Sequence, residues 1–152
     1  MLNDLFNSSS VCIVGVSLND NSKWGNQILF NLLEGGYKGN VYPVNKKGGY
    51  INDLVVYKSV LDTPSDSVGK MVVIAVPAQF VGSILNEMVE KNIKTVLIIS
   101  AGFSEIGNKK MEEEIINIAK KGNIKIIAGP NSFGIINKKS KLNLSLISTG
   151  KL

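Results

Sequence analysis

Short apolar runs rich in valine and isoleucine recur along the chain. They are Val11 to Val16, Asn40 to Val44, Met71 to Val76, Thr95 to Ile99, and Lys125 to Ala128. Each run is nearly continuous rather than alternating with polar residues, which is the pattern of strands buried on both faces of a parallel sheet. We therefore predict five parallel strands in the core of the fold.

Segments with the spacing of amphipathic helices separate these runs: Trp24 to Leu33, Ala78 to Lys91, and Asn108 to Lys121. The first stops at Gly35-Gly36, a suitable C-terminal cap. Strands and helices alternate, which predicts βαβ units with right-handed crossovers. The expected class is α/β, a Rossmann-like doubly wound, mainly parallel sheet with helices on both faces. The inward helix positions should be Ile28, Leu29, Leu32 and Leu33; Phe80, Val81, Ile84, Leu85 and Met88; and Met111, Ile115, Ile116, Ile118 and Ala119.

Two stretches are less regular. In Tyr50 to Val68 we expect a short strand near Val55 to Tyr57, a helical turn near Ser59 to Leu61, and a loop through Pro64. The stretch from Leu142 to Leu152 has an apolar run and then stops, as in a domain of a longer protein, although an exposed tail has the same pattern. A length of 152 residues suits one domain, so residues 1–152 are predicted to form a single domain.

The composition excludes several kinds of chemistry. The sequence contains no histidine, so a Ser-His-Asp triad, a Cys-His pair, a phosphohistidine and a histidine-rich metal site are all excluded. The single cysteine, Cys12, lies inside an apolar run and is interpreted as a core residue. We assign no catalytic residue and no metal site.

The same features bear on location. One cysteine permits no internal disulfide, no apolar run approaches the ~20 residues of a membrane-spanning helix, and the N-terminus lacks a secretory signal pattern. These features predict a cytoplasmic protein with no membrane partner.

The formal net charge of +5 suits nucleic acid, anionic lipid or a phosphate-bearing small molecule. Many lysines fall on predicted helix surfaces, and the sequence has no arginine and no pattern of aromatic and basic residues for stacking bases. We therefore expect no nucleic-acid partner, and the phosphate-bearing small molecule remains.

In a doubly wound sheet, ligands bind beyond the carboxyl ends of the strands. The first such loop runs from Gly15 and Ser17 to Lys23 and Gly25. A glycine permits a tight turn, Ser17 offers a hydroxyl to a phosphate, and Lys23 adds charge beside the free N–H groups of the next helix. The loop is neither a strict G-x-G-x-x-G nor a Walker A motif, and a Gly–Ser turn before a helix is often only a turn.

The second loop is Asn45-Lys46-Lys47-Gly48. An NAD-binding domain is expected to place an acid here to hold the ribose hydroxyls. Two lysines instead attract a ribose that carries an extra phosphate, as in CoA or NADP. A solvated basic turn is the plainer alternative.

The remaining loops are Val76-Pro77-Ala78, Ser100-Ala101-Gly102 and Gly129-Pro130-Asn131. Pro77 suits the start of a helix, Ala78 leaves room for adenine or ribose, and small residues after Ile99 let a ligand lie on the backbone. Each loop also has a plain structural interpretation. Together they support a ligand site, because they follow successive strands and so lie on one edge of the sheet.

Together these loops carry a resemblance to a known family. The motifs are Gly15-Val16-Ser17 with Lys23-Trp24-Gly25, Tyr42-Pro43-Val44-Asn45, Ala75-Val76-Pro77-Ala78, Ile99-Ser100-Ala101-Gly102-Phe103 and Gly129-Pro130-Asn131. In this order they resemble the N-terminal CoA-binding domain of NDP-forming acyl-CoA synthetases. That family includes ADP-forming acetate–CoA ligase and, more distantly, the α subunit of succinyl-CoA synthetase. The resemblance spans about Ser9 to Asn143.

The resemblance implies a CoA site. Ser17 with its turn, Lys23 and Gly25 would contact the CoA phosphates, and Lys46 or Lys47 the 3′-phosphate. Val76-Pro77-Ala78 would line the adenine side, Ile99-Ser100-Ala101 would contact the pantetheine, and Asn131 would lie near the reactive end. Neighbouring Gly15, Asn45 and Gly102 complete the expected CoA-binding residues.

The sequence departs from the family at two points. Ser132 stands where the family generally has a cysteine, and we assign it no nucleophilic role. The family works through a phosphohistidine on a second domain and an ATP-grasp module, whereas this chain has no histidine. The resemblance thus implies CoA or acyl-CoA binding here, with further ligase domains or subunits supplying the chemistry and no activity from this chain alone.

Two other functions remain open from the sequence. One is a stand-alone CoA-binding regulatory module. The other, less favoured because G-x-G-x-x-G is missing, is an NADP-binding domain of an oxidoreductase.

Overall fold

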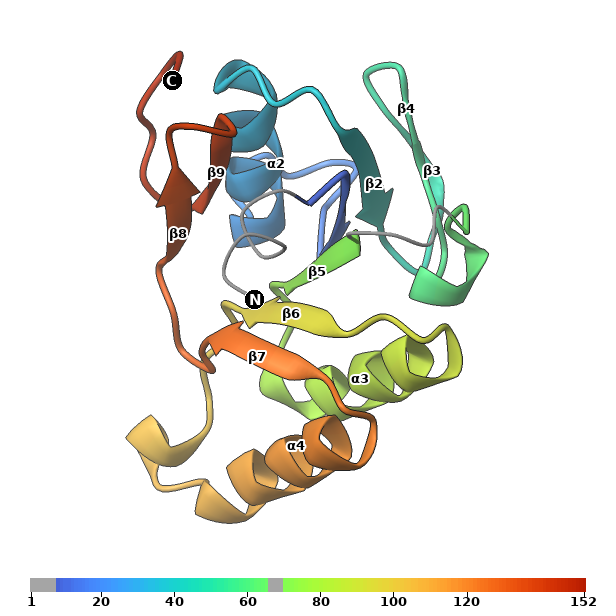
Figure 1. Cartoon of the computed structure of the whole chain (residues 1–152), viewed down its shortest axis with the longest axis vertical. Helices are drawn as coiled ribbons and strands as arrows, with labels where there is room; N and C mark the ends of the chain where they lie inside the picture. The colour runs from blue at the N-terminus through green and yellow to red at the C-terminus, as the bar shows by residue number, and fades with distance from the viewer. Residues whose placement is uncertain (1–7, 66–69) are drawn as a thin grey trace.

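The computed structural model describes residues 8–65 and 70–152. Within these residues a parallel sheet of five strands has the order β2-β1-β5-β6-β7 (Figure 1). The strands are β1 (Ser10–Val14), β2 (Asn40–Val44), β5 (Lys70–Ile74), β6 (Thr95–Ile98) and β7 (Lys125–Ala128). The five predicted strands are confirmed, although β1 and β5 end two residues earlier than expected. The chain leaves β1 toward β2 and later enters β5 on the other side, so strand order reverses between β1 and β5.

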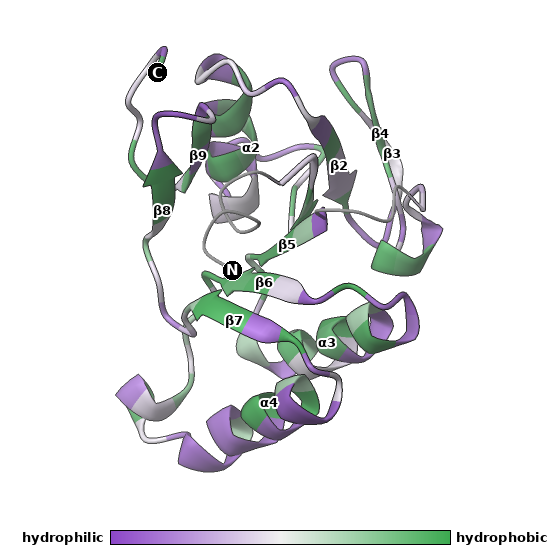
Figure 2. Cartoon of the chain, viewed as in Figure 1, coloured by the Kyte–Doolittle hydropathy of each residue, from purple (hydrophilic) through white to green (hydrophobic). Residues whose placement is uncertain are grey.

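Helices cover both faces of this sheet. Helix α2 (Trp24–Glu34) lies on one face, and α3 (Val81–Glu90) and α4 (Lys109–Lys121) lie on the other (Figure 1). Successive strand residues point to opposite faces, so Val11 and Ile13 pack with α2, whereas Cys12 and Val14 pack with α3. Strand β6 is largely hydrophobic, whereas β2 at the edge of the sheet includes hydrophilic positions, and the polar residues of α4 face outward (Figure 2). The doubly wound α/β prediction is confirmed.

The described residues also contain hairpins that the sequence pattern predicted only in part. Strands β3 (Gly49–Ile51) and β4 (Leu54–Val56) form one antiparallel hairpin, and β8 (Gly134–Asn137) and β9 (Leu142–Ser145) form another. Strand β9 packs against α2. The expected strand near Val55 and the turn near Ser59 correspond to β4 and the 3₁₀ turn η1 (Val60–Asp62), and the expected loop beyond Pro64 is described only as far as Ser65.

Two predicted inward side chains are exposed instead. Leu33 is 39% exposed. Asn31, two residues earlier, faces the β8–β9 hairpin and donates its amide hydrogen to the Ser145 carbonyl at 2.9 Å, and residues two apart do not share a helix face, so Leu33 points elsewhere. Phe80 is also 39% exposed, since it belongs to the 3₁₀ turn η2 (Ala78–Phe80) that precedes α3. A 3₁₀ turn has three residues per turn, so the apolar stripe of α3 does not extend back to Phe80.

Cys12 lies fully within the core. Burial raises the pKa of its thiol to about 12, so the group is neutral at physiological pH. A buried neutral thiol fits its interpretation as a core residue rather than a nucleophile. In the described part of the chain, no helix is both long enough and apolar enough to span a bilayer.

Candidate functional site

A cavity of about 880 Å³ opens at the carboxyl ends of β1, β2, β5 and β6. Gly15, Asn45, Val76 and Ser100, each following one of these strands within two residues, all line it. The cavity therefore spans the point between β1 and β5 where strand order reverses, which is where doubly wound folds bind their ligands.

The structure brings most of the predicted site residues to this cavity. Those that line it are Gly15, Ser17, Lys23, Asn45, Lys46, Lys47, Val76, Pro77, Ser100 and Ala101. Those that do not line it are Gly25, Ala78, Ile99, Gly102 and Asn131. Contact between these latter residues and a ligand stays a prediction.

The residues outside the lining have structural contacts of their own. Ile99 is buried in the core on the α2 side of the sheet, and the Asn131 N–H donates to the Ser100 carbonyl at 2.8 Å. The Gly102 N–H donates to the Glu105 carboxylate, which holds the pKa of that carboxyl below its usual range. These contacts stabilise the loops that follow β6 and β7.

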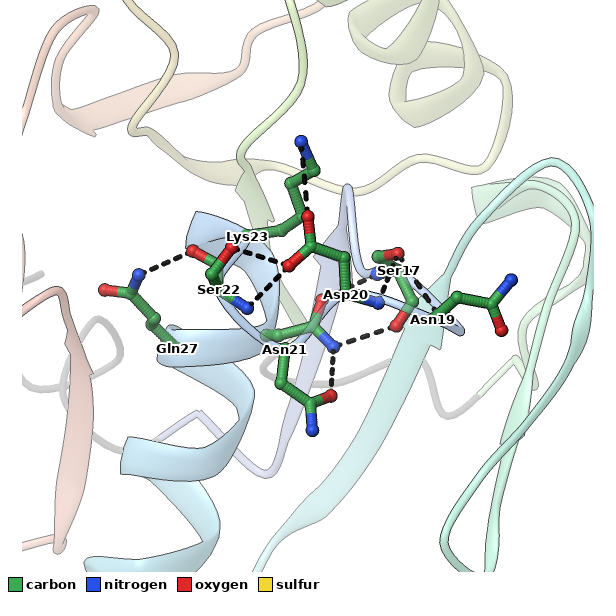
Figure 3. A network of polar contacts seen from close by, with 8 residues as sticks. Ser17, Asn19, Asp20, Asn21, Ser22, Lys23 and Gln27 are labelled. Atoms are coloured by element: carbon green, nitrogen blue, oxygen red, sulfur yellow. Dashed lines mark hydrogen bonds and ion pairs between the residues drawn. The ribbon is translucent and has the colours of Figure 1, made fainter.

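The loop between β1 and α2 is held by its own hydrogen bonds (Figure 3). The Ser17 hydroxyl oxygen accepts the N–H groups of Asn19 and Asp20 at 3.3 and 3.1 Å. Asp20 in turn accepts the hydroxyl and the N–H of Ser22, and these bonds hold the pKa of Asp20 below its usual range. The Ser17 hydroxyl uses its oxygen to shape the turn, which leaves its hydrogen available to a ligand.

A fully buried amide, Asn26, fixes Ser17 from the first turns of α2. Its Oδ1 accepts the Ser17 N–H at 2.6 Å, and its Nδ2 donates to the Ser17 carbonyl at 2.8 Å. A buried amide whose oxygen accepts and whose NH₂ group donates a hydrogen bond makes a specific, rigid contact. Asn26 could not be identified from the sequence, because an asparagine inside a helix gives no signal of the loop that it holds.

The N-terminus of α2 has the properties of an anion site. Lys23 precedes the helix, and among the described residues no side chain caps its first turn, so the first N–H groups remain available. The Lys23 amine lies 3.6 Å from an Asp20 carboxylate oxygen, and both side chains are largely exposed. Asp20 therefore offsets part of the charge that Lys23 brings to the cavity.

The basic turn after β2 is tied to the β1–α2 loop. The Asn45 side chain donates to the Val16 carbonyl at 2.6 Å and accepts the Lys47 N–H at 2.8 Å. The Lys46 amine lies 4.6 Å from the centroid of the Phe80 ring, within the range of a cation–π contact. Asn45 thus has a positioning role, and Lys46 reaches across the cavity toward the start of α3.

The exits of β5 and β6 are joined by Ser100, which is 2% exposed. Its hydroxyl oxygen accepts the Val76 N–H at 3.1 Å. The backbone at Val76-Pro77 and at Ser100-Ala101 is thereby held as one wall of the cavity.

Several lining residues were not predicted from the sequence or were given another role. They are Ser22, Trp24, Lys58, Ser59, Phe80, Ser83, Ile84 and Glu87. Ser22 and Trp24 belong to the first loop and the start of α2, whereas the others follow the β3–β4 hairpin or lie on η2 and α3, away from the loops that directly follow the sheet strands. The Lys58 side chain lies against Gly48, so it joins Lys46 and Lys47 around one turn.

Comparison with known proteins identifies the family. Residues 9–138 match the family described as CoA binding domain. The chain belongs to this CoA-binding family. Coenzyme A is therefore the ligand that its cavity is expected to accept, in agreement with the resemblance drawn from the loops, and the NADP alternative is not favoured.

Two similar proteins are ADP-forming acetate–CoA ligases or their subunits. The CoA-binding domain is 43% identical to acetate–CoA ligase (ADP-forming) I subunit alpha of Pyrococcus furiosus, covering 99% of this chain and 33% of that protein. It is 41% identical to acetate–CoA ligase (ADP-forming) II of Archaeoglobus fulgidus, covering 91% of this chain and 20% of that protein. The domain thus spans between a fifth and a third of these relatives.

A solved structure has the same fold over nearly the whole domain. Dinucleotide-forming acetyl-coenzyme A synthetase 1 of Ca. Korarchaeum cryptofilum, in complex with phosphate and ADP, matches 96% of this chain and 31% of its own. The TM-score is 0.90 and the sequence identity is 38%.

Proposed function

We propose that this chain is the CoA-binding domain of an ADP-forming acid–CoA ligase, a single N-terminal domain of a larger cytoplasmic enzyme. The observation that carries the proposal is the cavity that joins the predicted loops at the strand reversal. Similarity to acetate–CoA ligases over almost the whole chain favours a ligase part over a stand-alone regulatory module.

We assign the phosphates of CoA to two basic segments, the β1–α2 loop and the turn that follows β2. The diphosphate lies at Ser17 and the open first turn of α2, where free N–H groups and Lys23 attract negative charge. The 3′-phosphate lies at Lys46 and Lys47, whose exposed amines border the cavity.

The remaining parts of CoA follow from these positions. Val76 and Pro77 border the adenine side, and the wall at Ser100-Ala101 guides the pantetheine away from the sheet. Asn131, bonded to the Ser100 carbonyl, stands beyond that wall near the expected position of the thiol.

Catalysis is assigned to parts of the ligase outside this chain. A ligase that works through a phosphohistidine needs a histidine, and the sequence has none. A histidine-bearing domain and an ATP-grasp domain are the proposed partners, and the sizes of the relatives leave room for them.

CoA is expected to raise the melting temperature of the purified chain, whereas NAD is not. A ligand at about 100 times its Kd adds about 2.7 kcal/mol of stability, which is a shift of about 5 to 10 °C for a chain of this size. Differential scanning fluorimetry with CoA, acetyl-CoA, dephospho-CoA, NAD and NADPH measures this shift. No stabilisation by any of the three CoA compounds at millimolar concentration would contradict the proposed binding function.

The chain alone is expected to form no acyl-CoA from acetate, ATP and CoA, because it lacks the phosphate-carrying histidine. Trapping of any activated acyl group with hydroxylamine provides the measurement, and a complete ADP-forming ligase serves as the positive control. Turnover by the purified chain above the no-enzyme blank would contradict the assignment of catalysis to other parts of the ligase.

A further inference from the structure

Among the described residues that line the cavity, Glu87 is the single acid, whereas four lysines, at positions 23, 46, 47 and 58, are basic. CoA carries its negative charge on phosphates, and a carboxylate placed near them is unfavourable. A partly buried carboxylate in such a cavity needs a hydrogen-bond donor from the ligand to offset that repulsion. Glu87 therefore bears on which part of CoA lies at this end of the cavity.

The two oxygens of Glu87 have different surroundings. Oε2 accepts the Ser59 hydroxyl at 2.7 Å and the Val60 N–H at 2.9 Å, which fixes the carboxylate against η1. Oε1 accepts no hydrogen bond from the described residues around it. The carboxylate is thus anchored by one oxygen and retains the other for a donor in the cavity.

The position of Glu87 on α3 suits a flat, weakly polar group. Ile84 and Glu87 are three residues apart on α3, Phe80 belongs to the turn η2 just before it, and all three line the cavity. This wall of the cavity offers an aromatic ring and an aliphatic side chain beside the carboxylate. Adenine has apolar faces and carries an amine on its edge, so its shape and polarity match this wall.

We infer that Oε1 of Glu87 accepts a hydrogen bond from the exocyclic amine of the adenine ring and so selects adenine over bases with a carbonyl at that position. The inference rests on the proposed CoA site and adds the residue that reads the base. Lys58 lies against Gly48, and the adjacent Ser59 bonds Glu87, so the lysines proposed for the 3′-phosphate are linked to the side of the cavity that carries Glu87. Phosphate binding and base recognition would then set the orientation of the ligand together.

Isothermal titration of the 152-residue chain with CoA and with desamino-CoA, in which hypoxanthine replaces adenine, tests the inference. Hypoxanthine presents a carbonyl oxygen to Glu87 in place of the amine. A hydrogen bond to a charged group is worth enough to separate the two ligands by about tenfold to 100-fold. Equal affinity for both ligands would overturn the role of Glu87 while leaving CoA binding intact, whereas absence of CoA binding would overturn the proposed function as well.

Glu87→Gln is the decisive variant. Its amide oxygen still accepts the bonds from Ser59 and Val60, and its NH₂ group replaces the free oxygen and donates to hypoxanthine. The preference for CoA should fall below about twofold or reverse. An unchanged preference in this variant would overturn the inference.

Glu90→Gln is the matched control, because it makes the same change at an exposed position of α3 that does not line the cavity. This variant should retain the full preference for adenine. Loss of the preference in Glu90→Gln would show that the preference follows the net charge of α3 and would overturn the role of Glu87. The comparison of CoA with desamino-CoA on the unmodified chain stands as a test even if a variant does not fold.

Discussion

Changing Lys46 and Lys47 together to glutamate is expected to weaken CoA binding about 100-fold and to weaken dephospho-CoA binding much less. Both side chains are exposed at the cavity, on a turn whose backbone Asn45 fixes. Reversing two charges beside a phosphate costs about 3 kcal/mol after screening by water and salt, which is about 100-fold in affinity. Isothermal titration calorimetry with both ligands at one ionic strength gives the two ratios.

Lys138→Glu with Lys139→Glu provides the control for this experiment. These lysines are also adjacent and exposed in a turn, between β8 and β9, but they do not line the cavity. The control changes the net charge by the same amount, so it should alter CoA affinity by less than about threefold. Equal losses for CoA and dephospho-CoA in the Lys46 and Lys47 variant would remove the assignment of these residues to the 3′-phosphate.

The strands and most of the cavity were predictable from the sequence for one physical reason. A strand buried on both faces must be apolar at nearly every position, so Lys70–Ile74 and Thr95–Ile98 stand out from the segments around them. Once the strands are placed, the loops that follow them must meet at one edge of a parallel sheet. Ser17, Asn45, Pro77 and Ser100 reach one cavity by this rule.

The hairpins were harder to predict because their strands are only three or four residues long. Gly49–Ile51 and Leu54–Val56 are joined by Asn52-Asp53, with Asn52 at φ 50°, a turn conformation that asparagine tolerates. Strands this short offer too few positions to show a period of two. Lys58, which follows this hairpin, was therefore not placed at the cavity.

Helix-borne site residues were missed for a different reason. Glu87 lies on the polar side of the α3 stripe, and its sequence context is that of an ordinary solvated helix position. Only the tertiary contact with Ser59 and Val60 distinguishes it from Glu90, which is exposed on the same helix. Phe80 was assigned to the core because its spacing fits α3, and the 3₁₀ turn before the helix places it at the cavity instead.

Gly25 was expected to contact the CoA phosphates, and its surroundings show a close approach of backbones. A Cβ at this position would lie 2.4 Å from the Gly15 carbonyl oxygen and 2.8 Å from the Val16 nitrogen. The Gly15 backbone cannot move away from Gly25, because it is itself packed against the Ala75 carbonyl: a Cβ on Gly15 would lie 2.2 Å from that oxygen. The start of α2, the exit of β1 and the exit of β5 therefore meet without room for a side chain.

Gly25→Ala is accordingly expected to destabilise the fold by about 3 kcal/mol, because the methyl group meets rigid backbone. For a domain of this size the melting temperature should fall by roughly 10 °C. Thermal unfolding followed by circular dichroism measures the shift. Gly82→Ala is the matched control within α3, since its Cβ would meet only the Ile118 side chain at 3.6 Å, and alanine favours a helix.

The same variant separates the packing role of Gly25 from a role in holding CoA. If α2 must rest on the Gly15–Val16 backbone to aim its first N–H groups at the diphosphate, the folded variant should bind CoA and dephospho-CoA about tenfold more weakly, and both to the same extent. The uniform loss follows because both ligands carry the diphosphate. A Gly25→Ala chain with an unchanged melting temperature would contradict the close packing. A folded variant that loses affinity for CoA but not for dephospho-CoA would place Gly25 beside the 3′-phosphate instead.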